Sequence, residues 1–294
     1  MLAELLLEKG ADLASRDTFE RTALHIACEG KSLEMIKLLA ERSMPYIFDI
    51  RDAKGHIPLD IACLYHCPEA VRILLAQGKS VFGKGDRQVL ISTLNNSKAY
   101  KYAIPMISLL LDAGANIDAA DESGRTPMVT ALRRELVGAA NSTADQNHLY
   151  TDISMLLIDR GCDVNIPWLM GETALHIAAQ INHETLVRKL LISGSHIDRR
   201  DGFGPPLYYA CKNGKQTIVH LLRICGANLW AEDWEHHFEF WRWREELNEK
   251  NHQLLNYVFS ESKKCLTLQN LCNAAIRNIG KYSTELGLPS LLVK

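Results

Sequence analysis

The sequence predicts an all-α protein, a solenoid of stacked helix pairs joined by β-turn tips. The first observation is a repeated start, seen in TALHIACEG from Thr22 and TALHIAAQI from Thr173. The second is an apolar run that follows each start and closes on glycine or serine. The third is the spacing of those closing positions, which lie 33, 35, 36, 47, 33 and 32 residues apart. Regular periods of roughly 20–50 residues are typical of repeat architectures.

Each predicted unit contains two short amphipathic helices. In the first helix of the first full unit, Leu24, Ile26 and Ala27 are expected on one apolar face, and residues 36–39 repeat this pattern in the second helix. A helix pair this short cannot bury its apolar face alone, so we expect the units to stack. A glycine after the second helix permits the left-handed backbone that ends it. Threonines that are expected to cap first helices are Thr22, Thr126 and Thr173.

This pattern resembles the ankyrin repeat, whose period is about 33 residues and whose signature is a T-P-L-H-x-A start. The resemblance covers residues 1–232, with about six full units after a partial first one. It implies a face that binds a target protein. His25 and His176 stand at the histidine of the motif. We expect hydrogen bonds within the repeat turn rather than acid–base or metal chemistry there, because their partners recur with the repeat.

Two units depart from the pattern. The third, around residues 87–114, lacks the usual start. The fourth carries extra residues between Arg133 and Tyr150, where small, polar and Asn-rich sequence predicts a loop. Insertions in solenoids project from one face, often the binding one. The first residues of the chain resemble the second helix of a repeat unit whose first helix is absent. Either the array continues upstream, which we favour, or this helix acts as a cap.

Composition and charge are those of an ordinary globular protein. The chain has 294 residues, 47% of them hydrophobic, and a net charge of −2, which favours neither nucleic acid nor a membrane as partner. No apolar run approaches the roughly 18 residues of a spanning helix, and the N-terminus lacks the basic region of a signal peptide. We therefore expect the protein in the cytoplasm or the nucleus.

The eight cysteines are scattered, and several stand at apolar helix positions. Reduced, packed thiols are expected, as in an intracellular protein. Cys63, His66 and Cys67 lie close in sequence and suggest a metal site, but no second pair follows at zinc-ribbon spacing. We expect neither a metal nor another cofactor.

Residues 233–262 diverge from the repeat and are rich in aromatic side chains. Trp234, Phe238 and Trp241 recur at helical spacing. Capping or linker helices that close the array are expected, and a partner-binding aromatic surface is the alternative. His236 and His237 lie between glutamates, but adjacent residues point apart on a helix, which disfavours a metal site.

A short amphipathic helix is predicted from Thr267 to Gly280, the first as its N-cap and the second just past its end. A helix of about 12–15 residues is marginal on its own in water, so it needs a groove. That groove belongs either to this chain or to another protein. The apolar stripe comprises Leu268, Leu271, Cys272, Ala275, Ile276 and Ile279.

The pattern T-L-x-x-x-C-x-x-x-I from Thr267 to Ile276 resembles the BC box that opens a SOCS box. The whole chain thus resembles the ankyrin-repeat-and-SOCS-box family, with a small three-helix-type SOCS box at 263–294. The resemblance implies that Leu268 inserts into elongin C. The elongin-C-binding residues that it implies are Leu268, Leu271, Cys272, Ala275 and Ile276.

Residues 286–289, LGLP, resemble the cullin motif of the same box. The resemblance implies cullin contacts at Leu286, Leu288 and Pro289. Gly287 replaces the family's first proline, and glycine frees a backbone that proline would hold extended. The implied partners are elongin B/C, a cullin scaffold of the fifth-cullin type with its RING protein, and an unknown target protein.

The function that we expect is therefore a non-catalytic substrate-recognition adaptor of a ubiquitin ligase. A plain ankyrin scaffold, whose last helix only caps the solenoid, is the alternative. An enzyme is disfavoured because the sequence contains no phosphate loop, no GxSxG and no HExxH. Target contacts are expected at the insertion and at turn tips, where packing between turns is the alternative. The tip candidates are Phe19, Lys54, Trp168, Met170 and Phe203.

Overall fold

The computed structural model describes residues 2–77, 89–95, 100–141 and 147–228, together with residues 253, 254, 256–258 and 260. The chain divides into two compact units, residues 1–122 and 123–294, and each is described by itself. The described residues form helices and turns, without a strand. The predicted all-α solenoid of helix pairs is confirmed within each unit.

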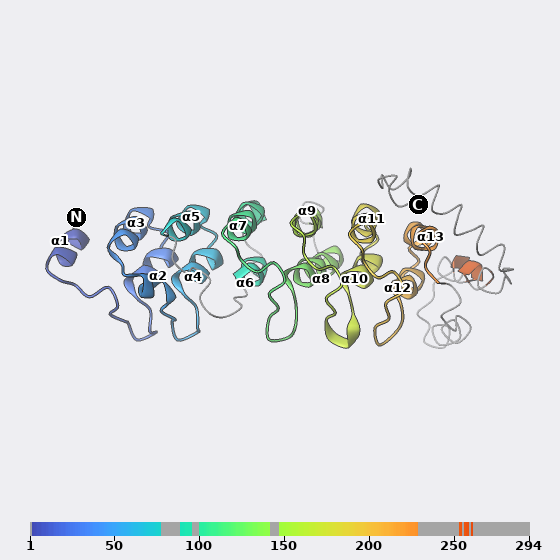
Figure 1. Ribbon diagram of the computed structural model, residues 1–294, viewed down its shortest axis with the longest axis horizontal. Coiled ribbons are helices and arrows are strands. Elements are labelled where there is room, and N and C mark those ends of the chain that lie inside the picture. The colour runs from blue at the N-terminus through green and yellow to red at the C-terminus, as the bar shows by residue number, and fades with distance from the viewer. Residues whose placement is uncertain are drawn as a thin grey trace, which may run out of the picture. The chain divides into compact units, whose positions relative to one another are not determined.

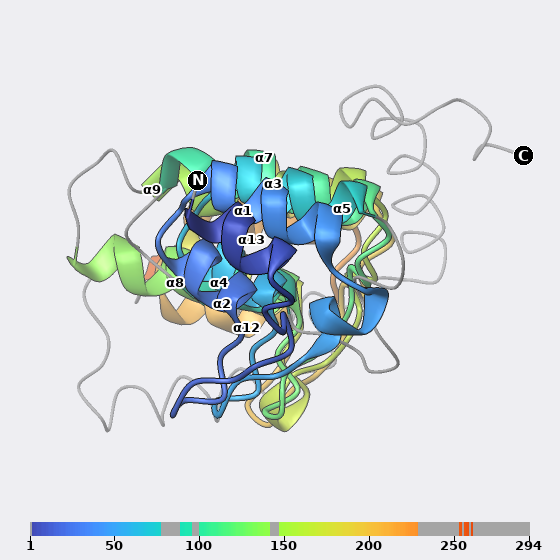
Figure 2. The same cartoon turned by 90° about the vertical axis from the view of Figure 1, so that its left-hand side faces the viewer.

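Unit 1 is a stack of helix pairs (Figure 1). The first helices α2, α4 and α6 pack side by side in one layer, and the second helices α3, α5 and α7 pack in another. Figure 2 shows both layers end-on, with the tip loops extending beyond the layer of first helices. The elements are α1 (Leu2–Glu8), α2 (Ala23–Glu29), α3 (Leu33–Arg42), η1 (Pro45–Asp49), α4 (Pro58–Leu64), α5 (Pro68–Ala76), α6 (Val89–Asn95) and α7 (Tyr100–Asp112).

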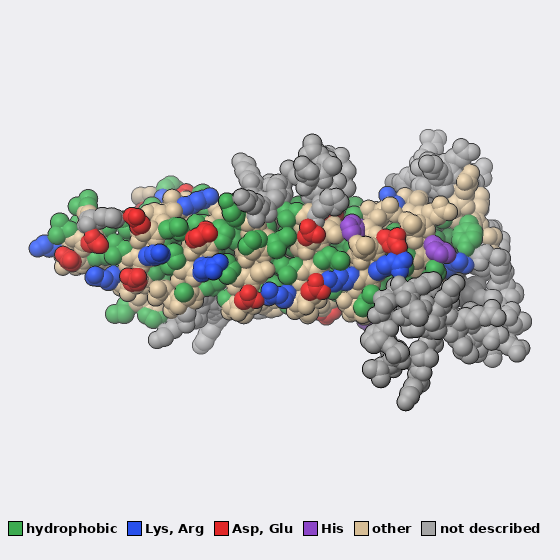
Figure 3. All heavy atoms as spheres, turned by 90° about the horizontal axis from the view of Figure 1, so that it is seen from above, with side chains coloured by type: hydrophobic (Ala, Val, Ile, Leu, Met, Phe, Trp, Pro, Cys, Tyr) green, Lys and Arg blue, Asp and Glu red, His purple; other side chains and the backbone are tan. Residues whose placement is uncertain are grey.

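Unit 2 repeats this arrangement. The first helices α8, α10 and α12 pack in sequence, as do the second helices α9, α11 and α13. Seen from above, the side of the second helices mixes acidic, basic and apolar side chains (Figure 3). The elements are α8 (Pro127–Asn141), α9 (Asn147–Asp159), η3 (Leu169–Gly171), α10 (Ala174–Ile181), α11 (Glu184–Ile192), α12 (Pro206–Lys212) and α13 (Gln216–Ile224).

The predicted loop between Arg133 and Tyr150 is wrong over most of its length. α8 continues to Asn141 and α9 begins at Asn147, so the extra residues lengthen both helices of the pair. The added turns are tied together, because a buried Glu135 carboxylate accepts a hydrogen bond from the Thr151 backbone N–H at 3.1 Å. Strong helix formers at residues 133–136, namely Arg, Arg, Glu and Leu, support a helix, and this propensity outweighed the polar composition of the insertion.

The predicted apolar face of α2 is wrong at one position. Leu24 and Ala27 are buried, but Ile26 is 47% exposed. Two residues turn an α-helix by about 200°, so a side chain at i+2 points away from the one at i. Ile26 therefore lies on the surface of the first-helix layer instead of in the core.

The predicted hydrogen bonds of the two histidines within the repeat turn are confirmed, and each histidine also links its tip to the next. In unit 1 the His25 Nδ1 accepts a hydrogen bond from the Thr22 backbone N–H at 3.1 Å, and its Nε2 lies 3.1 Å from the His56 carbonyl. In unit 2 His176 makes the same contacts with Thr173 and with the Gly204 carbonyl. Burial lowers the pKa of both imidazoles, which favours their neutral form.

The threonine caps are confirmed at Thr126, whose hydroxyl accepts a hydrogen bond from the Val129 N–H at 3.3 Å. At Thr22 and Thr173 the hydroxyl lies 2.8 Å from the histidine Nδ1 of the same motif. The histidine thus takes part in capping the helix, and the T-x-L-H start is one connected unit.

Several predicted features lie outside the described residues. These include the aromatic stripe at Trp234, Phe238 and Trp241 and the pair His236 and His237. They also include the implied elongin and cullin contacts, namely Leu268, Leu271, Cys272, Ala275, Ile276, Leu286, Leu288 and Pro289. Within residues 253–260, Leu254 and Val258 are buried, and the Arg223 guanidinium of α13 lies 5.7 Å from the Tyr257 ring centre.

Candidate protein-interaction surface

The first tip of unit 1 is built around an aspartate. Asp17 Oδ1 accepts hydrogen bonds from the backbone N–H groups of Phe19 at 2.9 Å and Arg21 at 2.8 Å. This turn holds Phe19 outward, where 62% of its surface is exposed. The Arg21 guanidinium lies 5.1 Å from the Phe19 ring centre, a cation–π geometry.

Arg21 links this tip to the first-helix layer. Its guanidinium pairs with Asp17 at 2.8 Å and with Glu29 of α2 at 2.6 Å. The hydrogen bond from Arg21 holds the pKa of Asp17 below its usual value. Glu29 also accepts a hydrogen bond from the Tyr65 hydroxyl at 2.9 Å, which raises the pKa of Tyr65. The next tip joins this surface, since the Ala53 N–H donates to the Phe19 carbonyl at 2.9 Å.

In unit 2, Trp168 occupies the place of the turn aspartate. Its indole Nε1–H donates to the Ser123 carbonyl at 3.0 Å, and the Arg133 guanidinium of α8 lies 4.6 Å from its ring centre. Arg133 also pairs with the buried Glu172 carboxylate. Burial raises the pKa of Glu172, and the positive charge of Arg133 opposes that rise.

The tip that starts at Trp168 packs against the tip that follows it. Met170 has a left-handed backbone with φ of 59°. Its side chain lies against the next tip, where a Cβ built on Gly202 would be 2.5 Å from the Met170 methyl carbon. Leu169 and Met170 are 58% and 66% exposed, and Phe203 on the next tip is 57% exposed. Three large apolar side chains thus stand on two neighbouring tips.

Asp201 fixes the tip that carries Phe203. Its Oδ1 accepts hydrogen bonds from the backbone N–H groups of Phe203 at 2.8 Å and Gly204 at 2.9 Å. The Tyr209 hydroxyl donates to its Oδ2. Burial raises the pKa of Tyr209 strongly, so this hydroxyl keeps its proton and remains a donor.

The structure separates the five predicted target contacts into two groups. Phe19 and Lys54 stand on neighbouring tips of unit 1, and Trp168, Met170 and Phe203 stand on neighbouring tips of unit 2. Trp168 is half-buried, and its indole mainly supports Arg133. The sequence pattern did not predict the exposed apolar residues Leu169, Ile26 and Tyr65. The position of Leu169 between Trp168 and Met170 could have indicated its exposure. The position of Ile26, two residues after the buried Leu24 on a helix, could have done the same.

The described cysteines are reduced thiols, buried except for the half-buried Cys225. Burial raises the pKa of Cys28 to about 12 and raises the pKa of Cys63 and Cys211 further, so these thiols are inert near neutral pH. In the part of the chain that the structure describes, no group of three or more His, Cys, Asp or Glu residues is placed to hold a metal ion. In that same part, every helix is too short or too polar to cross a membrane.

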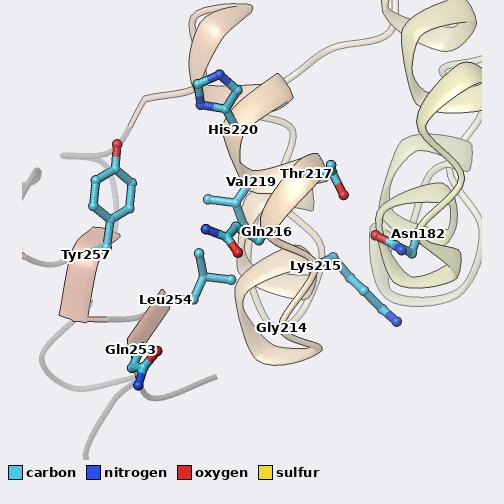
Figure 4. Close-up of a pocket in the computed structure, with 10 residues that line it drawn as sticks. All are labelled: Asn182, Gly214, Lys215, Gln216, Thr217, Val219, His220, Gln253, Leu254 and Tyr257. Atoms are coloured by element: carbon cyan, nitrogen blue, oxygen red, sulfur yellow. The ribbon is translucent and has the colours of Figure 1, made fainter. Parts of the chain in front are cut away.

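A depression of about 960 Å³ lies between α13 and residues 253–257 (Figure 4). Leu254 and Tyr257 face α13, and Val219 and His220 line the α13 side of the depression. Its polar groups come from α13 and the turn before it, from Asn182 at the end of α10, and from Gln253 and Tyr257. The depression lies where residues 253, 254 and 257 meet the last described helix pair.

The stacked helix pairs with outward tips define a repeat protein. A family model described as ankyrin repeats in three copies matches residues 1–84 and 141–233, more than half of the chain. The chain therefore belongs to the ankyrin-repeat family, and its repeats form a protein-interaction domain.

Individual relatives agree with this family. The chain is 30% identical over 141 residues, 46% of its length, to the B-cell lymphoma 3 protein homolog of Mus musculus, of which the match covers 30%. The crystal structure of the Bcl-3 ankyrin repeat domain matches 70% of the chain and 85% of its own chain with a TM-score of 0.54 and 25% identity. The human ASB11 ankyrin repeat domain matches 71% of the chain and 86% of its own, with a TM-score of 0.50 and 21% identity. The chain spans less than a third of the length of the curated relatives it matches.

Proposed function

We propose that this chain is the substrate-recognition adaptor of an elongin B/C–cullin–RING ubiquitin ligase. The ankyrin repeats bind the target protein, and the segment that begins at Thr267 binds elongin C. Leu268 enters an apolar pocket of elongin C, and the small thiol of Cys272 permits a close approach of the two helices. Burying one leucine contributes about 1.5–3 kcal/mol, which makes Leu268 the hot spot of this interface.

The proposal rests on the order of the repeats, the segment after them and the motif near the C-terminus. The last described helix pair of the ankyrin array is α12 and α13, Tyr257 lies against Arg223 of α13, and the pattern T-L-x-x-x-C-x-x-x-I starts at Thr267. An isolated amphipathic helix of about 12–15 residues is marginal in water, so this segment gains stability from a partner. The motif LGLP at 286–289 then contacts the cullin through Leu286, Leu288 and Pro289.

The adaptor itself carries no catalytic residue in this proposal. It raises the local concentration of target lysines near the ubiquitin that the ligase delivers, an effect of tethering. The reduced, buried thiols fit a protein of the cytoplasm or the nucleus, where such ligases would meet their targets.

Binding of the purified full chain to purified elongin B/C tests the proposal. We expect the wild-type chain to form a stable complex and Leu268→Ala to weaken it by about 10-fold or more, the factor that corresponds to losing a buried leucine. Gln269→Ala is the matched control, since it lies on the polar side of the same predicted helix, and it should bind as the wild type does. If the folded wild-type chain does not bind elongin B/C, the chain is a plain ankyrin scaffold.

A further inference from the structure

We propose that Met170 is an oxidation site, and that the state of its thioether controls the contact between two neighbouring tips of unit 2. The tips are residues 168–172 and residues 201–204. The oxidant is a peroxide, and the product is methionine sulfoxide. This inference is independent of the adaptor function proposed above, because it concerns the contact between repeats alone.

Met170 is accessible to an oxidant dissolved in water. Among the described methionines, Met170 and Met44 are the exposed ones, at 66% and 64% of their surface. The other described methionines are half-buried or buried. A peroxide in solution should therefore reach the sulfur atoms of Met170 and Met44 first.

The Met170 side chain lies on the following tip. A Cβ built on Gly202 would be 2.5 Å from the Met170 methyl carbon and 3.7 Å from its sulfur. Gly171 is also close to that tip, since a Cβ built there would be 3.3 Å from the Arg200 carbonyl oxygen. Glycines at 171 and 202 thus allow the two tips to approach, and the thioether of Met170 covers the space over Gly202.

The backbone of Met170 makes this contact easy to open. Its φ of 59° lies in the left-handed region, which is unfavourable for residues other than glycine. Such residues persist only where the surrounding structure holds them. The contact with Gly202 is one such restraint, so its loss allows the backbone at 169–171 to leave this conformation. Met44, by comparison, has an ordinary extended backbone, with φ of −73° and ψ of 151°.

The oxidation is a two-electron step that balances with peroxide alone. The Met170 sulfur donates an electron pair to one oxygen of hydrogen peroxide, so an S–O bond forms and the O–O bond breaks. The other oxygen leaves as hydroxide and takes the proton from the transferred oxygen, which yields the sulfoxide and water. The sulfur is oxidised, and the peroxide is reduced.

The sulfoxide does not fit over Gly202 as the thioether does. Its oxygen is a polar acceptor that is best satisfied by water. The sulfur of a sulfoxide is pyramidal, so turning the oxygen to water also turns the methyl group away from Gly202. The following tip stays closed, because Asp201 Oδ1 still accepts hydrogen bonds from the Phe203 and Gly204 backbone N–H groups. The expected change is therefore confined to residues 168–172.

Treatment of the purified full chain with dilute hydrogen peroxide, followed by dithiothreitol to restore oxidised thiols, tests the proposal. Peptide mass spectrometry measures the sulfoxide at each methionine, and hydrogen–deuterium exchange measures the opening of the tip. We expect Met170 and Met44 to oxidise at similar rates. Amides at 169–172 should then exchange about 5-fold faster or more, the effect of a small loss of local stability. Amides of Phe203 and Gly204 should be unchanged, and methionine sulfoxide reductases should restore slow exchange at 169–172.

Met170→Leu and Met44→Leu are matched variants. Peroxide should speed exchange at 169–172 in Met44→Leu as in the wild type. It should have no such effect in Met170→Leu, which keeps an apolar side chain over Gly202 but cannot form a sulfoxide. Met170→Gln is polar and of similar length, and it should exchange fast at 169–172 without peroxide.

Three results would each overturn the proposal. In the first, Met170 resists peroxide while Met44 is oxidised. In the second, the chain with sulfoxide at Met170 exchanges at 169–172 as the untreated chain does. In the third, Met170→Leu responds to peroxide as the wild type does.

Discussion

The tips at Asp17 and Trp168 reach the same turn by different chemistry. In both, the backbone N–H of the first residue donates to the carbonyl four residues later, at 3.0 Å in unit 1 and 2.7 Å in unit 2. In unit 1 the aspartate side chain fixes the turn through two backbone N–H groups. In unit 2 the tryptophan side chain points to Arg133, and the turn has two left-handed residues, Met170 and Gly171, whereas the unit 1 turn has one, Glu20.

This comparison shows what the repeat requires and what it leaves free. The histidine links are the same in both units, because they satisfy buried groups of the stack. The first tip residue varies, because more than one side chain can support it. Variation there allows a tip to carry apolar side chains outward without loss of the stack.

The largest effect is expected from removing the histidine links. His25→Ala and His176→Ala should each lower the free energy of unfolding by about 3 kcal/mol, since each leaves a cavity and unpaired buried polar groups. Urea unfolding of the full chain measures this. Similar losses in the free energy of unfolding would support equal roles of the two histidines. A loss below about 1 kcal/mol for either variant would show that the two links are not equivalent.

Replacing Trp168 sharpens the comparison between tips. Trp168→Ala should destabilise the chain by about 1–2 kcal/mol, because it removes the contact with Arg133 and the hydrogen bond to Ser123. Trp168→Asp should cost less, since an aspartate restores the turn found at Asp17. Thermal unfolding ranks the two variants, and an aspartate that is worse than alanine would show that the two tips are not equivalent.

Releasing backbone strain should stabilise both units slightly. Met170→Gly and Glu20→Gly each replace a left-handed residue, with φ of 59° and 58°, and should each raise the free energy of unfolding by about 0.5–1 kcal/mol. Calorimetry of the two variants beside the wild type measures the change, and a variant that is less stable than the wild type would contradict the assigned strain at its position.

A pH dependence from the same histidines is the smallest effect. Burial lowers the folded-state pKa of His25 and His176 below 6.5, so their contribution to stability is complete above pH 6.5 and is lost as pH falls toward the folded values. Glu172 acts in the opposite sense, because burial raises its pKa and favours the protonated folded form. Comparing unfolding between pH 7.5 and 5.5 in wild type and His176→Ala isolates the histidine part, whose absence would contradict this assignment.

The fold could be predicted from the sequence because the same pattern occurs in several repeats. The start, the apolar run and the closing glycine each recur at a fixed distance, so errors in one unit are corrected by the others. The insertion was mistaken for a loop because it occurs once, and its polar residues concealed two extended helices. The stacking of Trp168 on Arg133 joins residues far apart in the chain, and no local pattern records such a contact. Ile26 was predicted in the core because it is apolar and close to Leu24 in sequence. Two residues along an α-helix correspond to about 200°, so its side chain points away from that of Leu24.

Hydrogen–deuterium exchange of the full chain, alone and with purified elongin B/C, tests the central claim most directly. The adaptor proposal predicts fast exchange at 267–279 in the chain alone and strong protection of those amides in the complex. The tips at 168–171 and 200–204 should exchange equally in both samples. Amides at 267–279 that are already protected in the chain alone and remain unchanged by elongin B/C would contradict the claim.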